Sequence, residues 1–212
     1  MSIEKIMVEL DWRDISDHYY ERHDVHTHLL SLFKARNVVD FSDLLVGIGN
    51  GHGNYSASDH ELGPKILEEN VNSRKRLYDV SEKFMELKNS NTVPKLIRDA
   101  GLKYFQIGVG SEASCMLNPA VCWVTNTKTV WAHLLFKHNG NASLANEELR
   151  LYRNGEENSD MAYSKWRAIH KEMGASSDVL IKYSVKYTKT NVENMNYLWA
   201  DSISNALYEL NR

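Results

Sequence analysis

The stretch from residue 14 to residue 36 contains neither glycine nor proline. Its large side chains recur every three or four residues, which is the spacing that places them on one face of an α-helix rather than on alternate faces of a strand. These positions are Ile15, Tyr19, His26, Leu30 and Phe33. The stretch is therefore predicted to form one long helix.

Similar periodicity and capping residues predict further helices along the chain. They cover residues 64–87, 94–100, 126–137, 143–152, a segment opened by Ser159 or Asp160 and stopped by Gly174, then 177–187 and 192–210. Residues 102–109 have the pattern of a strand, and residues 3–8 are the segment that could pair with them. We predict an all-α, bundle-like domain of about eight helices, with a minor two-strand element if these segments pair. An α+β fold is the alternative.

The length of 212 residues and the hydrophobic content of 42% suffice for a core without disulfides or structural metals. Three prolines and no low-complexity tract leave no linker, so residues 1–212 are predicted to form a single domain. Cys115 and Cys122 have neither zinc-knuckle spacing nor that of a secreted disulfide framework. We expect both thiols to be buried small hydrophobes.

The first residues carry Glu4, Lys5 and Glu9, and so lack the apolar segment of a signal peptide. Nowhere does an apolar run approach the roughly 20 residues of a membrane span. We therefore expect a cytoplasmic protein with no membrane partner. The net charge of −3 does not provide the positive footprint of non-specific nucleic-acid binding. The sequence is compatible with a nucleotide or nucleic-acid substrate and with assembly into a homo-oligomer.

Four histidines and three carboxylates lie between residues 17 and 28. On a helix, Asp17, Glu21, Asp24 and His28 share one face, which is the arrangement that holds a divalent metal between helices. Oxygen-rich ligation favours Mg or Mn, and added imidazoles favour Zn or Fe. Arg22, His23 and His26 are the candidate catalytic residues, and a free histidine could serve as general acid or base. A solvated acidic face, with His23 and His26 as core positions, is the alternative.

Two glycine-bearing stretches could complete a site. The segment 47–63 is predicted to be a long loop, and its His52 and His60 would join the ligands of the histidine run if the loop folds back. Residues 108–114 follow the predicted strand, so the amides near Gly110 and Ser111 could bind an anion at a helix N-terminus. The alternative interpretation of that segment is an ordinary turn capped by Ser111.

Short patterns in the histidine run resemble known families over about seven residues. The segment Arg22–His28 resembles the arginine–polar–x4–histidine signature of HEPN ribonucleases, and Arg13–His18 matches its shorter spacing. These enzymes are all-α and independent of metal. The resemblance implies that Arg22 stabilises phosphate charge and that His28 transfers protons.

Two other resemblances concern metal enzymes. The dipeptide His23–Asp24 resembles the doublet of the all-helical HD phosphohydrolases, in which a further histidine ligand lies one helix upstream. Residues 24–28 resemble the Asp-x-His-x-His motif of amidohydrolase and PHP phosphoesterase barrels. That motif ends an apolar barrel strand, and this chain has no pattern of eight strands.

Three function classes follow from these observations. The first is a small helical hydrolase that acts on a phosphodiester or nucleotide through a divalent metal held by the histidine run and the loop. The second is a HEPN-like, metal-independent ribonuclease. The third is a non-catalytic helical interaction protein whose histidines belong to the core or the surface.

Overall fold

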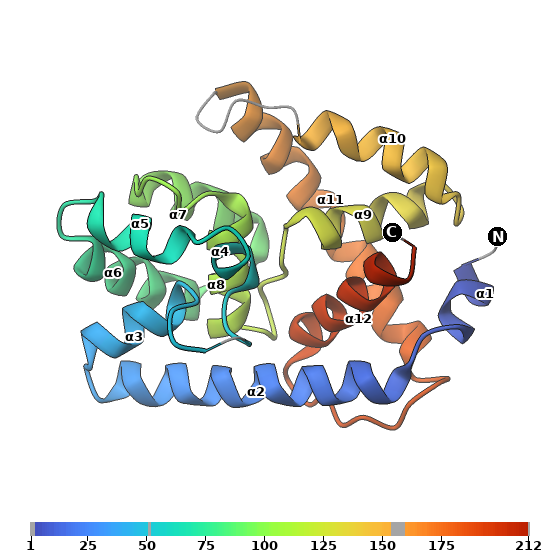
Figure 1. Ribbon diagram of the computed structural model, residues 1–212, viewed down its shortest axis with the longest axis horizontal. Helices are drawn as coiled ribbons and strands as arrows, with labels where there is room; N and C mark the ends of the chain where they lie inside the picture. The colour runs from blue at the N-terminus through green and yellow to red at the C-terminus, as the bar shows by residue number, and fades with distance from the viewer. Residues whose placement is uncertain (1–2, 51, 154–159, 212) are drawn as a thin grey trace.

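The computed structural model describes residues 3–50, 52–153 and 160–211, and in these ranges it contains α-helices, one short 3-10 helix and no strand. Figure 1 shows their arrangement. The helices are α1 (Ile3–Val8), α2 (Trp12–Lys34), α3 (Val38–Leu45), α4 (Tyr55–Ser58), α5 (Leu62–Glu68), α6 (Ser73–Glu86), α7 (Val93–Ala100), α8 (Ile107–Leu117), α9 (Thr127–Lys137), α10 (Ala142–Arg153), α11 (Asp160–Ser184) and α12 (Asn196–Leu210), and the 3-10 helix η1 is Ser90–Thr92. The predicted all-α class is confirmed, with twelve α-helices in the described ranges rather than about eight.

Helix α2 runs along one side of the molecule and connects two groups of helices (Figure 1). Helices α3 to α8 lie over one half of it, and α9 to α12 lie over the other. Direct packing of α2 on α3, α8 and α12 joins both groups to the same helix, and α8 also touches α12. The buried side chains of both halves therefore form one continuous core.

The predicted helix over residues 14–36 is confirmed as α2, which begins two residues earlier. The Asp11 carboxylate accepts hydrogen bonds from the amides of Arg13 and Asp14 at 3.0 and 3.1 Å, so the N-terminal turn is capped before the apolar pattern starts. The helix ends at Lys34 because Arg36 adopts a left-handed backbone with φ of 55°.

The strand predicted for residues 102–109 is wrong. Tyr104 has a φ of 64°, which is incompatible with an extended strand, and helix α8 already begins at Ile107. Residues 3–8, the suggested pairing partner, form helix α1. Most apolar residues of the two segments are buried by helix packing, although Val8 is 65% exposed, so their hydrophobicity does not distinguish a strand from a helix.

Three predicted boundaries also change. The helix predicted over 64–87 divides into α5 and α6, because Asn72 takes a φ of 53° between them. The loop predicted over 47–63 contains α4 and the start of α5. Gly174 does not stop a helix: α11 continues through it, and a Cβ at this position would lie 3.0 Å from the Trp123 ring. Gly174 therefore serves close packing. The alternative opening residue, Ser159, lies outside the described residues.

Other predictions hold. Gly101 ends α7 with a φ of 61°, and Asn126 opens α9 with a complete capping box. Cys115 and Cys122 are free and buried, as expected of small hydrophobes. Among the helices that the structure describes, none is both long and apolar enough to span a membrane.

Candidate metal centre

The structure brings the segment after α3 onto helix α2 and joins three potential metal ligands, His18, Glu21 and His52. Each offers one donor atom, and these atoms all lie within 4.8 Å of one another. The shortest contact joins Nδ1 of His52 to Oε2 of Glu21 at 3.0 Å. Glu21 and His52 were predicted as ligands from the sequence, whereas His18 was not.

The Tyr55 side chain, from the first turn of α4, completes this group. Its hydroxyl lies 3.1 Å from His52 Nδ1 and 3.5 Å from His18 Nδ1. Burial and the nearby carboxylates of Glu112, Glu21 and Asp201 raise the pKa of Tyr55 to about 12, although Arg22 opposes the shift. We call His18, Glu21, His52 and Tyr55 the open cluster, because the Glu21 and His52 side chains are 51% and 45% exposed.

His18 is the most enclosed member of the open cluster. Burial and the positive charge of Arg22 lower its pKa to about 4, so the imidazole is neutral at neutral pH. Its Nε2 atom is buried and has no hydrogen-bond partner among the described residues. A neutral imidazole is the form that ligates a metal ion.

Asn54 fixes the loop that carries His52 and Tyr55. Its buried side-chain amide donates to the carbonyls of Leu45 and Val109 at 3.2 and 2.9 Å, which ties the loop to α3 and α8. Its side-chain oxygen accepts from the Ala57 amide at 3.1 Å and caps α4. Gly47 permits the preceding turn with a φ of 77°.

One helical turn beyond His18, a second polar group fills the interior. Arg22 is fully buried and lies between Glu112 of α8 and Asp201 of α12, which are also buried. Its Nη2 donates to Glu112 Oε1 at 3.0 Å, and its Nη1 lies 2.7 Å from Asp201 Oδ2. We call Arg22, Glu112 and Asp201 the buried ion cluster. It connects three helices that are distant in sequence.

Glu112 also connects the two clusters. Its Oε1 accepts from the Tyr55 amide at 3.0 Å, and its Oε2 accepts from the amide and hydroxyl of Ser56 at 3.0 and 2.6 Å. Arg22 lies 5.1 Å from the centre of the Tyr55 ring. The backbone of α4 is therefore anchored on a buried carboxylate, and the open cluster is positioned by the buried one.

Asp201 is the less satisfied carboxylate. Its contact with Arg22 lacks hydrogen-bond alignment, and neither of its oxygens has a hydrogen bond within the described chain. Burial raises its pKa to about 7, with the Arg22 charge acting against the shift. Two carboxylates facing one guanidinium leave a surplus of negative charge, which is consistent with this direction.

The other predicted ligands do not join the centre. The grouping of metal-competent donors in the described chain includes neither Asp17, Asp24, His28 nor His60. The Asp17 and Asp24 side chains are exposed, and Asp17 faces Arg13 at 4.0 Å. Two of the four nevertheless border the centre, because Asp24 and His28 line an open depression of about 260 Å³. Its lining residues are Glu21, Asp24, Val25, His28, Asn50 and His52.

The candidate catalytic residues lie apart from this depression. Arg22 is enclosed and neutralised by carboxylates, so the phosphate-binding role implied by the HEPN resemblance does not fit its position. His26 is buried, and its Nδ1 lies 2.6 Å from the Met116 carbonyl, to which it donates. Burial lowers the pKa of His26, so it is a neutral core histidine. His23 is half-buried beside the Tyr19 ring and 3.7 Å from Asp24.

The predicted anion site at Gly110 and Ser111 is not formed. Both residues are buried inside α8, and a Cβ on Gly110 would lie 2.6 Å from Ile97. The Ser111 hydroxyl accepts the Thr125 amide at 2.8 Å. The small residues of this segment allow close helix packing. The functionally informative residue of the segment is the neighbouring Glu112, which binds Arg22, Tyr55 and Ser56.

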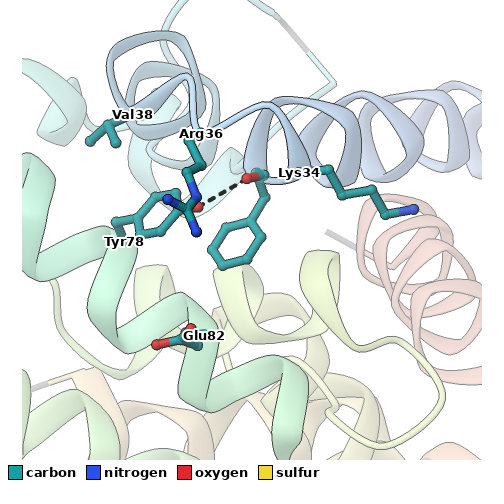
Figure 2. A pocket seen from close by; sticks show the side chains of 6 residues that line it. Lys34, Arg36, Val38, Tyr78 and Glu82 are labelled. Atoms are coloured by element: carbon teal, nitrogen blue, oxygen red, sulfur yellow. Dashed lines mark hydrogen bonds between the residues drawn. The ribbon is translucent and has the colours of Figure 1, made fainter.

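A larger concave surface lies at the far end of α2 (Figure 2). It is an open pocket of about 430 Å³ lined by Phe33, Lys34, Arg36, Val38, Tyr78 and Glu82. The rings of Phe33 and Tyr78 stack at 4.3 Å, and the Tyr78 hydroxyl donates to the Phe33 carbonyl at 2.9 Å. The two aromatic rings of the pocket thus pack on each other, and the Tyr78 hydroxyl already has a hydrogen-bond partner within the protein. The open cluster therefore carries the more distinctive chemistry.

Comparisons of the chain with protein-family models, with curated proteins and with solved structures found no match.

Proposed function

We propose that this chain is a metal-dependent hydrolase of the cytoplasm that acts on a phosphodiester or nucleotide at the open cluster. The observation that carries the proposal is the convergence of His18, Glu21 and His52, whose donor atoms lie within 4.8 Å of one another. Two imidazoles and one carboxylate are a ligand set that leaves coordination positions for water and substrate.

The mixed donor set favours Zn, Mn or Fe over Mg, which prefers an all-oxygen environment. A bound ion would lower the pKa of its water and supply a hydroxide nucleophile near neutral pH. It would also neutralise the negative charge of Glu21 and Asp24, which would otherwise repel a phosphate. Metal is thus required both for the chemistry and for substrate approach.

The depression beside the cluster supplies the space for the substrate. Of its lining residues, His28 is exposed and can transfer a proton to a leaving group. Because His26 is buried against Met116, His28 is the better candidate for proton transfer. The depression is small and open, which suits a phosphate ester whose remaining part lies in solvent.

The first test measures metal binding by tag-free, chelator-treated protein titrated with Zn²⁺, Mn²⁺ and Fe²⁺ by calorimetry. Wild type is expected to bind one equivalent, and Glu21→Ala and His52→Ala to lose affinity by at least about tenfold. Asp24→Ala is the matched control, because Asp24 lies on the same helix and outside the ligand group. It should bind like wild type.

The second test measures hydrolysis of bis(p-nitrophenyl) phosphate and of a panel of nucleotides. Activity should depend on added metal and fall with the ligand variants, while Asp24→Ala retains metal binding. Failure of wild type to bind any of the three ions, or turnover that persists in chelator, would refute the proposal.

A further inference from the structure

The Tyr55 hydroxyl lies where a fourth metal ligand would be. Metal–ligand bonds of about 2.0–2.1 Å in tetrahedral geometry place neighbouring donor atoms about 3.3–3.4 Å apart, and octahedral geometry brings them somewhat closer. The separations from His52 Nδ1 to Glu21 Oε2 and to the Tyr55 oxygen are 3.0 and 3.1 Å, and that from His18 Nδ1 to the Tyr55 oxygen is 3.5 Å. These three separations match the edge lengths of one coordination shell, and the donor atoms of His18, Glu21 and His52 all lie within 4.8 Å of one another.

The hydrogen-bonding capacity of the metal-free group supports the same assignment. His52 Nδ1 faces both Glu21 and the Tyr55 hydroxyl, and a ring nitrogen that donates its one proton to the carboxylate has none for the hydroxyl. The tyrosine hydroxyl can donate to His18 Nδ1, but at 3.5 Å this bond is long. One cation between the four side chains would satisfy all of these donor atoms together.

The tyrosine is held in place from the opposite side. Glu112 fixes its backbone amide at 3.0 Å, and the Arg22 guanidinium lies 5.1 Å from the centre of its ring. Both partners are completely buried. The phenol oxygen is thus preorganised at the inner edge of the cluster, as a metal ligand requires.

We propose that Tyr55 is a metal ligand and that the open cluster is a His18–Glu21–His52–Tyr55 centre suited to ferric iron. The inference rests on the proposed metal site and adds a ligand and a metal class to it. A phenolate is a hard, anionic oxygen donor, and two anionic oxygens with two neutral imidazoles suit a trivalent ion better than an all-imidazole set would. On coordination the Tyr55 O–H bond breaks, the oxygen binds the iron, and the proton leaves to solvent.

The test loads chelator-treated protein with Fe³⁺ supplied as its nitrilotriacetate complex and records visible absorption. Wild type should develop a tyrosinate-to-iron charge-transfer band, with phenolate modes in its resonance Raman spectrum. Tyr55→Phe should lose the band and bind iron at least about tenfold more weakly. Tyr20→Phe is the control, because Tyr20 is exposed on α2 and should keep the band.

The resonance Raman measurement needs only wild type, so the proposal can be refuted even if Tyr55→Phe fails to fold. Iron bound without phenolate modes would overturn the ligand assignment, as would a band that survives in Tyr55→Phe. If Zn²⁺ still bound in a Glu21-dependent way in either case, the metal-site proposal would stand alone. If wild type bound no metal at all, both proposals would fall.

Discussion

Helix α2 contributes to two neighbouring clusters, the open cluster and the buried ion cluster, and these differ in how their polar groups are satisfied. In the buried ion cluster, Arg22 and Glu112 are completely enclosed, and Glu112 accepts bonds from one guanidinium, two amides and a hydroxyl. In the open cluster, Glu21 is 51% exposed and meets His52 at 3.0 Å. The buried ion cluster uses its polar atoms for contacts within the protein, whereas the open cluster is accessible to a ligand.

The comparison teaches that burial decides which role a charged residue can take. A buried charge that loses its partner is costly, so such a group is committed to the fold. A half-exposed pair contributes little to stability because water and salt screen it. Function is therefore expected where side chains are fixed in position but still have free donor or acceptor atoms. Here the buried ion cluster fixes the open cluster, because Glu112 binds the backbone amide of Tyr55.

The largest expected effect comes from removing the cation of the buried ion cluster. Arg22→Ala leaves Glu112 and Asp201 enclosed without a counter-charge, so the free energy of unfolding should fall by about 3–5 kcal/mol. Arg13→Ala is the control on the same helix: its side chain is 92% exposed, and the change should stay within about 0.5 kcal/mol. Urea unfolding measures both. Equal small losses for both variants would show that the buried charge of Arg22 matters no more to stability than the exposed charge of Arg13.

The next effect concerns pH and Asp201. Because burial raises its folded-state pKa to about 7 while an unfolded aspartate titrates near 3.9, the folded protein holds a proton there that the unfolded chain releases. The contribution of this group is most favourable below pH 4 and is lost as the pH rises towards 7. Asp201→Asn removes this dependence and leaves Arg22 paired with Glu112 alone.

The difference in unfolding free energy between Asp201→Asn and wild type should therefore shift in favour of the variant by about 1–3 kcal/mol as the pH rises from 5 to 8. Asp24→Asn, with a side chain 89% exposed, should show no such change. Urea unfolding at the two pH values provides the comparison. An Asp201→Asn variant that parallels wild type would mean that Arg22 keeps Asp201 ionised throughout.

The sequence was sufficient for features that local chemistry determines. The apolar spacing in residues 14–36 predicted α2, and Asn126 and Gly101 predicted the ends of α9 and α7. Errors arose where the backbone or tertiary packing overrode the pattern. Tyr104 takes a left-handed conformation inside an apparent strand, and Gly174 packs on Trp123 instead of ending a helix.

The side chains that meet in the open cluster were predicted only in part, and their metal binding stays a prediction. Glu21 and His52 were chosen correctly as neighbours, but His18 was passed over, although it lies three residues before Glu21 and so on an adjacent position of the same face. The partnership of Arg22 with Glu112 and Asp201 could not be derived from spacing, because it depends on how α2, α8 and α12 pack. A usable signal existed: Glu112 is the single charged residue of α8.

The smallest expected effect is on the metal-free stability of the open cluster. His52→Ala should change the unfolding free energy in chelator by no more than about 0.5 kcal/mol, because the contact with Glu21 is half-exposed and competes with solvent. Adding Zn²⁺ at about 100 times its dissociation constant should then stabilise wild type by about 2.7 kcal/mol, since an ion that binds only the folded state shifts the folding equilibrium. The variant should gain little, and urea unfolding with and without metal measures both quantities. A large loss for His52→Ala in chelator would place the open cluster among the structural elements, and the contrast between the two clusters on α2 would then disappear.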